Sequence, residues 1–262
     1  MCSRILAGRL LCVILHILTG LCACVFVIPW IGSARRMGHI QRWSRRVLRT
    51  FGVTVEAGGE PVPANVLLVA NHISWVDVFV INARFPSHFV AKSEVRRWPL
   101  IGPLAALAGT VFVARGRPSD LKREVGKLAG SLRAGARVAC FPEGTSAAQG
   151  DMQPFRANLF DAAIDARAPV QAIAISYAGD DGNPHPAVEY IAETSLAESM
   201  VAILTGPPIR ARLHALAPIA PEGAHRRALA LATEEQIRAA LASGEPERIH
   251  RPDTYPRKIR HN

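Results

Sequence analysis

The sequence predicts an α/β domain that follows an N-terminal membrane helix and a basic interfacial helix. Residues 10–31 contain no Asp, Glu, Lys or Arg, and residues 35–51 combine six arginines with a periodic apolar face. Beyond Gly52, short apolar runs alternate with helical stretches, as is typical of an α/β domain. We therefore divide the 262 residues into an anchor (1–33), an interfacial helix (34–51), a main domain (52–243) and a polar tail (244–262).

The uncharged segment at residues 10–31 is long enough to cross a membrane. As a helix it reaches about 33 Å, and a hydrocarbon core is about 30 Å thick. Arg4 and Arg9 precede the segment, whereas six arginines follow it, so the positive-inside rule favours a cytoplasmic main domain. A cleaved signal peptide is the first alternative, because residues 21–24 faintly resemble a lipoprotein cleavage site. A re-entrant or surface-lying helix is the second.

Residues 35–51 predict a basic amphipathic helix that lies on an anionic membrane. The alternative is a helix packed on the main domain with a solvated arginine face. The formal net charge of +10 implies an anionic partner of some kind. Because the densest arginines adjoin an apolar segment rather than an aromatic-lined groove, we expect a membrane surface and no nucleic acid. The apolar residues at helical spacing are Met37, Ile40, Trp43, Val47, Leu48 and Phe51.

The five cysteines predict neither a disulfide framework nor a zinc site. Four of them lie in or beside the apolar segment, and Cys140 lies in a strand-like run. We expect no metal and no redox cofactor.

The main domain is expected to contain seven strands and six helices in alternation. The expected strands are residues 53–57, 66–70, 88–91, 110–114, 137–141, 170–176 and 209–216. The expected helices are residues 75–83, 99–108, 119–133, 155–166, 196–204 and 224–241. From Gly244 the prolines and scattered charges predict a poorly ordered tail.

A polar turn after the strand at residues 66–70 carries His72 and Asp77. Five positions on a continuous helix would separate these side chains by about 140°, so they can meet only if His72 lies outside the helix. Ser74 and Asp77 have the spacing of a capping box, which would start the helix just after His72. The alternative is that Asp77 is only a helix-start residue and His72 an ordinary turn histidine.

A second polar turn, Glu143-Gly144-Thr145, follows the strand at residues 137–141. Such a turn can offer backbone N–H groups, a hydroxyl and a carboxylate to a ligand. Taken alone it is a weak signal, but it gains weight beside the first turn.

Four segments, in order, resemble the signature blocks of the glycerolipid acyltransferase family, whose members include 1-acylglycerol-3-phosphate O-acyltransferases. They are Asn-His-Ile-Ser-Trp-Val-Asp at residues 71–77, Lys-Ser-Glu at 92–94 followed by Pro99, Gly102 and Val-Phe-Val-Ala-Arg at 111–115, Phe-Pro-Glu-Gly-Thr at 141–145, and Ala-Pro-Val-Gln-Ala-Ile at 168–173. The similarity spans residues 52–241 and implies an α/β fold with a mixed central sheet flanked by helices.

The resemblance implies a membrane-bound O-acyltransferase that moves a fatty acyl group from acyl carrier protein or acyl-CoA to a lysolipid hydroxyl. This agrees with the chemistry of His72, which as a general base would take the proton of the hydroxyl while Asp77 holds the imidazole. Because the hydroxyl attacks the thioester directly, Ser74 and Cys140 are not expected to act as nucleophiles. The donor is a cosubstrate, not a cofactor.

The resemblance also implies that Arg115, Glu143, Gly144 and Thr145 hold the polar head of the acceptor. A guanidinium suits phosphate because it donates two hydrogen bonds at once. Glu143 repels a dianion, so we expect it to meet a glycerol hydroxyl or to orient a neighbouring base. The implied location is a bacterial-type inner membrane, with the catalytic domain in the cytoplasm.

Two positions depart from the commonest family pattern. Ser146 follows Thr145 where an arginine is frequent, so one cationic phosphate ligand is missing from this segment. Asn158 stands where many members carry glycine, and the stretch around it resembles lyso-ornithine lipid acyltransferases. The expected acceptors are 1-acyl-sn-glycerol-3-phosphate and lyso-ornithine lipid. A lysophospholipid transacylase, a hydrolase with the same site and a non-catalytic membrane-binding module are the alternatives.

Overall fold

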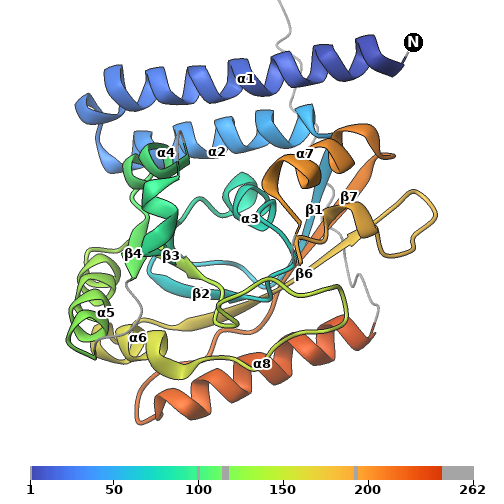
Figure 1. The fold of residues 1–262 in the computed structure, drawn as a ribbon. Coiled ribbons are helices and arrows are strands. Elements are labelled where there is room, and N and C mark those ends of the chain that lie inside the picture. The colour runs from blue at the N-terminus through green and yellow to red at the C-terminus, as the bar shows by residue number, and fades with distance from the viewer. Residues whose placement is uncertain (1, 99–100, 114–117, 192–193, 244–262) are drawn as a thin grey trace, which may run out of the picture.

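The computed structural model describes residues 2–98, 101–113, 118–191 and 194–243 (Figure 1). Arg115 and the predicted tail at residues 244–262 therefore lie outside the described residues.

The described part of the chain forms a seven-stranded sheet in the order β1-β7-β6-β2-β5-β3-β4. Only the pairing of β6 with β7 is antiparallel; the other pairs are parallel, so the sheet is mixed as predicted. The strands are β1 (Val53–Gly59), β2 (Val66–Ala70), β3 (His88–Lys92), β4 (Val111–Val113), β5 (Arg137–Cys140), β6 (Val170–Ala178) and β7 (Ile209–Ala215).

Helices cover both faces of this sheet (Figure 1). The α-helices are α1 (Cys2–Phe26), α2 (Ser33–Thr50), α3 (Asp77–Arg84), α4 (Ile101–Leu107), α5 (Pro118–Arg133), α6 (Asp161–Ala166), α7 (Leu196–Thr205) and α8 (Arg226–Ser243). Short 3-10 helices lie at Ile28–Trp30, Ser93–Arg97, Ala157–Phe160 and Pro186–Val188. Figure 1 shows α2, α3 and α7 on one face, with α1 outside α2, and α5, α6 and α8 on the other.

Two hydrophobic cores lie on the two faces of the sheet, and β2 serves both. Its side chains alternate: Val66, Leu68 and Ala70 belong to the core under α2, α3 and α7, whereas Leu67 and Val69 belong to the core with α5, α6 and α8. A strand between two such layers is apolar throughout, and all five β2 residues are buried. This central strand leads directly into the first polar turn.

All seven predicted strands and the six helical regions of the main domain are present, with shifted ends. The helix expected at residues 75–83 begins at Asp77, and the one expected at 155–166 divides into a 3-10 turn at Ala157–Phe160 followed by α6. The predicted capping box is only half formed. The Asp77 carboxylate accepts a hydrogen bond from the Ser74 amide, but Val76 is the N-cap, and no described residue hydrogen-bonds the Ser74 hydroxyl.

The N-terminal helix α1 lies along α2 instead of standing apart from the domain (Figure 1). The Trp43 indole donates to the His16 carbonyl at 3.0 Å, and the His16 ring is 2.8 Å from the Thr50 hydroxyl. At Gly20, an added Cβ would lie 3.1 Å from the Trp43 ring, a tight contact that the glycine avoids. On its other side α1 exposes a row of large apolar residues, namely Leu11, Ile14, Leu15 and Leu18.

By length and composition, residues Ala7–Trp30 could cross a membrane, with a mean hydropathy of 2.7 in the most apolar window. The described fold therefore contains the apolar helix that the sequence predicts. The contacts with α2 add that one side of this helix belongs to the protein interior.

Candidate active site

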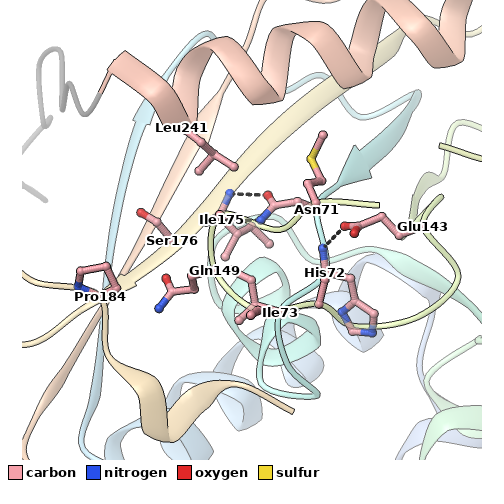
Figure 2. Close-up of a pocket in the computed structure, with 13 residues that line it drawn as sticks. Asn71, His72, Ile73, Glu143, Gln149, Ile175, Ser176, Pro184 and Leu241 are labelled. Carbon is pink, nitrogen blue, oxygen red and sulfur yellow. Dashed lines mark hydrogen bonds between the residues drawn. The ribbon is translucent and has the colours of Figure 1, made fainter. Parts of the chain in front are cut away.

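The two polar turns meet because β2 and β5 are parallel neighbours. Val69 is paired with Cys140 in the register of these strands, so both strands end at the same edge of the sheet. Loops that follow the carboxyl ends of adjacent parallel strands form the usual ligand site of α/β sheets. His72 and Glu143 follow directly, and the His72 amide donates to Oε1 of Glu143 at 2.6 Å (Figure 2).

His72 and Asp77 form the predicted pair. Nδ1 of His72 lies 2.8 Å from Oδ2 of Asp77, since His72 precedes α3 and Asp77 is its first residue. The carboxylate is completely buried and also accepts from the amides of Ile73 and Ser74, at 2.8 and 2.9 Å. Because a carboxylate is an acceptor, the proton of the neutral imidazole lies on Nδ1 and leaves Nε2 free to accept another.

Tyr177 of β6 completes the hydrogen bonding of Asp77. Its hydroxyl donates to Oδ1 of Asp77 at 2.6 Å, across 100 positions of sequence. Burial, together with the negative charge of Asp77, raises the pKa of Tyr177 well above its ordinary value. Tyr177 therefore remains a hydrogen-bond donor at physiological pH. Sequence reasoning missed this residue because only the β2–β6 pairing brings it near the turn.

Phe141 and Asn71 fix the surroundings of the imidazole. The Phe141 ring stacks on the His72 ring, with centroids 4.1 Å apart and planes 12° from parallel. The Asn71 side chain exchanges two hydrogen bonds with the backbone of Ile175, at 2.8 and 2.9 Å. Figure 2 shows the His72 ring directed away from this Asn71 clamp. The Phe141 ring thus packs on the His72 imidazole, and the hydrogen bonds of Asn71 fix the backbone that precedes His72.

Glu143 is buried and ties two loop segments together. Besides the His72 amide at Oε1, its Oε2 accepts from the Gln153 amide at 2.7 Å. Burial raises the pKa of Glu143, while these two hydrogen bonds act in the opposite direction. Both carboxylate oxygens therefore accept hydrogen bonds from the protein itself. Of the two roles expected from the sequence, contact with a glycerol hydroxyl or orientation of a neighbouring base, this arrangement fits the second.

Gly144 and Thr145 continue the turn toward solvent. Gly144 has φ of +72°, a conformation that glycine adopts readily and other residues rarely do. Thr145 is exposed, so its hydroxyl is available to a ligand. The structure thus brings His72, Asp77, Glu143, Gly144 and Thr145 to one edge of the sheet, while the position of Arg115 lies outside the described residues.

A cavity of about 240 Å³ adjoins the two turns (Figure 2). Its lining includes His72, Gln149, Ile175, Ser176 and Leu241, so it lies between the first turn, β6 and the end of α8. His72 is one of the residues that line this cavity, and 21% of its side chain is exposed.

The candidate nucleophiles and metal ligands can be assessed from the same geometry. Ser74 is fully buried, and burial raises the pKa of Cys140 to about 12. A buried thiol with so high a pKa contains almost no reactive thiolate at neutral pH. Within the described residues, no three His, Cys, Asp or Glu side chains gather as a metal site. The arrangement suits a general base acting on a bound hydroxyl.

Comparison with known proteins shows the family of this chain. The acyltransferase family model matches residues 54–176, which contain both turns. The lyso-ornithine lipid O-acyltransferase of Pseudomonas aeruginosa is 35% identical over 199 residues, covering 76% of each chain. The chain belongs to the acyltransferase family.

Two further comparisons agree that this chain is an acyltransferase. The 1-acyl-sn-glycerol-3-phosphate acyltransferase of Neisseria meningitidis serogroup B is 35% identical over 202 residues, covering 76% of this chain and 78% of that protein. The crystal structure of the 1-acyl-sn-glycerophosphate (LPA) acyltransferase PlsC from Thermotoga maritima superimposes with a TM-score of 0.69. It covers 92% of this acyltransferase and 95% of that chain at 20% identity, and so it supports the fold.

Proposed function

We propose that this acyltransferase transfers a fatty acyl group from an acyl thioester to the hydroxyl of a lysolipid at a membrane surface. The observation that carries the proposal is the pairing of His72 Nδ1 with the buried Asp77 carboxylate at the edge of the sheet. It provides a partly exposed base whose Nε2 has no hydrogen-bond partner among the described residues, and deprotonation of an alcohol requires such a nitrogen.

In the proposed reaction, Nε2 of His72 takes the proton of the acceptor hydroxyl as its oxygen attacks the thioester carbonyl carbon. The carbon–sulfur bond then breaks, and the thiolate leaves and takes the proton from the imidazolium. Asp77 stabilises the imidazolium while it exists, because its carboxylate accepts the Nδ1 proton. The four donors that converge on Asp77 keep this carboxylate in place through the cycle.

The acceptor head is proposed to bind along the turn that follows β5. Gly144 and Thr145 directly follow Glu143, which is hydrogen-bonded to the His72 amide, and Arg115 is proposed to contribute a guanidinium. Glu143 supports this turn from inside and positions the His72 backbone. Relatives with 33–35% identity are named lyso-ornithine lipid O-acyltransferases and 1-acyl-sn-glycerol-3-phosphate acyltransferases, so we propose both acceptors.

The membrane is proposed to contact α1 and α2. The exposed apolar row of α1 faces away from the domain, and the arginines of α2 suit an anionic headgroup layer. The hydrogen bonds between α1 and α2 favour a helix embedded along the membrane together with its domain over one that crosses alone. The main domain then lies in the cytoplasm, where acyl carrier protein and acyl-CoA are available.

The function is tested by supplying purified protein in lipid vesicles with acyl-CoA or acyl carrier protein thioester and a panel of lysolipids. We expect release of free thiol that depends on added lysolipid, with the diacylated product identified by mass spectrometry. Thiol release without lysolipid would indicate a hydrolase instead. Product formation from phospholipid alone, without thioester, would indicate a transacylase.

A further inference from the structure

Arg156 returns to the active-site turn from 12 positions further along the chain than Gly144. The Arg156 amide donates to the Pro142 carbonyl at 3.0 Å, and this bond closes the loop that leaves at Glu143. Glu143 reinforces the closure through its hydrogen bond with the Gln153 amide. The backbone of Arg156 is therefore fixed beside the turn, although the side chain itself is exposed.

The guanidinium of Arg156 lies over Gly144. A Cβ added at Gly144 would be 3.2 Å from Nη1, 3.3 Å from Cζ and 3.5 Å from Nε of Arg156. These three atoms are spread across the planar group, so the guanidinium faces the glycine broadside. A side chain at position 144 would displace the guanidinium. Glycine is therefore favoured here for two reasons, this contact and the positive φ.

This guanidinium has donors to offer a ligand. Among the described residues, no carboxylate forms an ion pair with Arg156 and no acceptor is hydrogen-bonded by its side chain. A guanidinium carries five N–H donors in a fixed fork that matches carboxylate and phosphate groups. An exposed guanidinium with unused donors, at the same turn as the exposed Thr145 hydroxyl, is suited to bind an anionic headgroup.

The neighbouring Ser146 is engaged elsewhere. Its hydroxyl donates to the carbonyl of Tyr190, so its side chain is directed to the segment after Pro186–Val188. The cation that the sequence lacks at position 146 is thus offered in space by a residue from a later segment.

We propose that Arg156 binds the anionic group of the lysolipid acceptor beside the Glu143-Gly144-Thr145 turn. This proposal rests on the proposed function. It changes one expectation from the sequence: the acceptor site has not lost a cation through Ser146, because Arg156 supplies one from the opposite side of the loop. Arg156 is a binding residue and takes no part in proton transfer at His72.

The kinetic test compares Arg156→Ala, Arg156→Lys and, as a matched control, Arg227→Ala, which removes an exposed arginine from α8. With lysophosphatidic acid, the KM of Arg156→Ala should rise by about ten- to hundredfold, as expected for loss of a charge-assisted hydrogen bond. The kcat and the KM of the thioester should change little. Arg156→Lys should recover part of the loss, since it keeps the charge but not the fork, and Arg227→Ala should behave like the wild type.

Comparing two acceptors distinguishes a binding role of Arg156 from a purely structural one. Monoacylglycerol has a hydroxyl acceptor but no anionic group, so its turnover should be equally slow in the wild type and in Arg156→Ala. An equal loss with both acceptors, or an unchanged KM for lysophosphatidic acid, would overturn the proposal.

Failure of this proposal is distinguishable from failure of the proposed function. If the wild type forms no diacylated product from any lysolipid, the function is wrong. If the wild type forms this product and Arg156→Ala has the same preference for lysophosphatidic acid over monoacylglycerol, only the role of Arg156 is wrong. Binding of the acceptor can be measured without turnover in His72→Ala. The affinity of this variant for lysophosphatidic acid in micelles should be higher than that of the double variant His72→Ala/Arg156→Ala.

Discussion

At the scale of single residues, the environment of Asp77 explains how a charged group can be completely buried. Burying a carboxylate is unfavourable unless hydrogen bonds replace the lost water. Asp77 receives four, from the His72 ring, two backbone amides and the Tyr177 hydroxyl. Three of these are local to the turn, and the fourth arrives from the sheet. The orientation of the base is therefore set by both the turn and the strand layer beneath it.

We predict that His72→Ala abolishes acyl transfer while the fold and membrane association persist. Removal of a general base typically lowers the rate by about 10²–10⁴-fold, and His72 contributes little to the core because it is partly exposed. Initial rates with a thioester and a lysolipid, beside a thermal unfolding curve, provide the measurement. Near-normal turnover in a folded variant would refute the mechanism.

Tyr177→Phe is predicted to lower both activity and stability at neutral pH. The change leaves Oδ1 of Asp77 without its 2.6 Å donor, a loss of about 1–3 kcal/mol in the free energy of unfolding. The rate should fall as well, because the carboxylate that holds His72 becomes less fixed.

The same variant should be less sensitive to alkali. The pKa of Tyr177 is raised in the folded protein, so above about pH 10 the unfolded chain loses this proton and the folded chain keeps it. The stability contributed by the tyrosine is thus present below that pH and lost as the pH rises. Urea unfolding at pH 8 and above pH 10 should show the gap between wild type and variant narrowing; a constant gap would contradict the assignment.

At the scale of elements, α1 packs closely on α2 at Gly20. We predict that Gly20→Leu releases α1 from α2, because even a Cβ at this position would press on the Trp43 and Leu104 side chains at 3.1 Å. Faster cleavage by a protease between α1 and α2, and a changed Trp43 fluorescence, would report the release.

Gly8→Leu is the matched control for this experiment. It lies on the same helix, and an added Cβ there meets nothing within 4 Å. The two variants add the same apolar side chain, so a difference between them reports packing and not hydropathy. Equal protease sensitivity in both would show that α1 is not held at Gly20.

The elements were predictable from the sequence to different degrees. Short continuous apolar runs located strands such as β2, because its side chains are buried in cores on both faces of the sheet. The start of α3 was misplaced because a serine-to-aspartate spacing predicts a cap, whereas the Asp77 side chain is turned to the His72 ring. The resemblance pointed to both turns of the site. Tyr177 could not be found, since it reaches the site through strand pairing across 100 positions. Arg156 belongs to the stretch around Asn158 that the sequence singled out, but its contact with Gly144 appears only in the folded loop.

At the scale of the whole molecule, the apolar and basic surfaces lie on the side that carries α1 and α2 (Figure 1). The exposed apolar residues of α1 and the arginines of α2 belong to adjacent helices. Under the proposed function, these two helices form the layer of the protein that contacts the membrane. This arrangement predicts that association depends on both hydrophobic insertion and anionic lipid.

We predict that the main domain faces the cytoplasm in a bacterial cell. Reporter fusions after α8 should be active only when the reporter works in the cytoplasm, and added protease should not reach the domain in intact spheroplasts. The physical reason is the excess of arginine after the apolar helix, which the positive-inside rule retains on the cytoplasmic side. A domain exposed on the periplasmic face would refute both this topology and the thioester donor.

The loop after β5 is bonded to both backbone groups of the base. The His72 amide donates to Glu143, and the His72 carbonyl accepts from the Ala147 amide at 2.8 Å. A loop joined in this way cannot swing open as a lid without carrying the His72 imidazole with it. Gating of substrate entry, where it occurs, must therefore come from other segments, and the amides of His72 and Ala147 should exchange their hydrogens with solvent slowly and at similar rates through turnover.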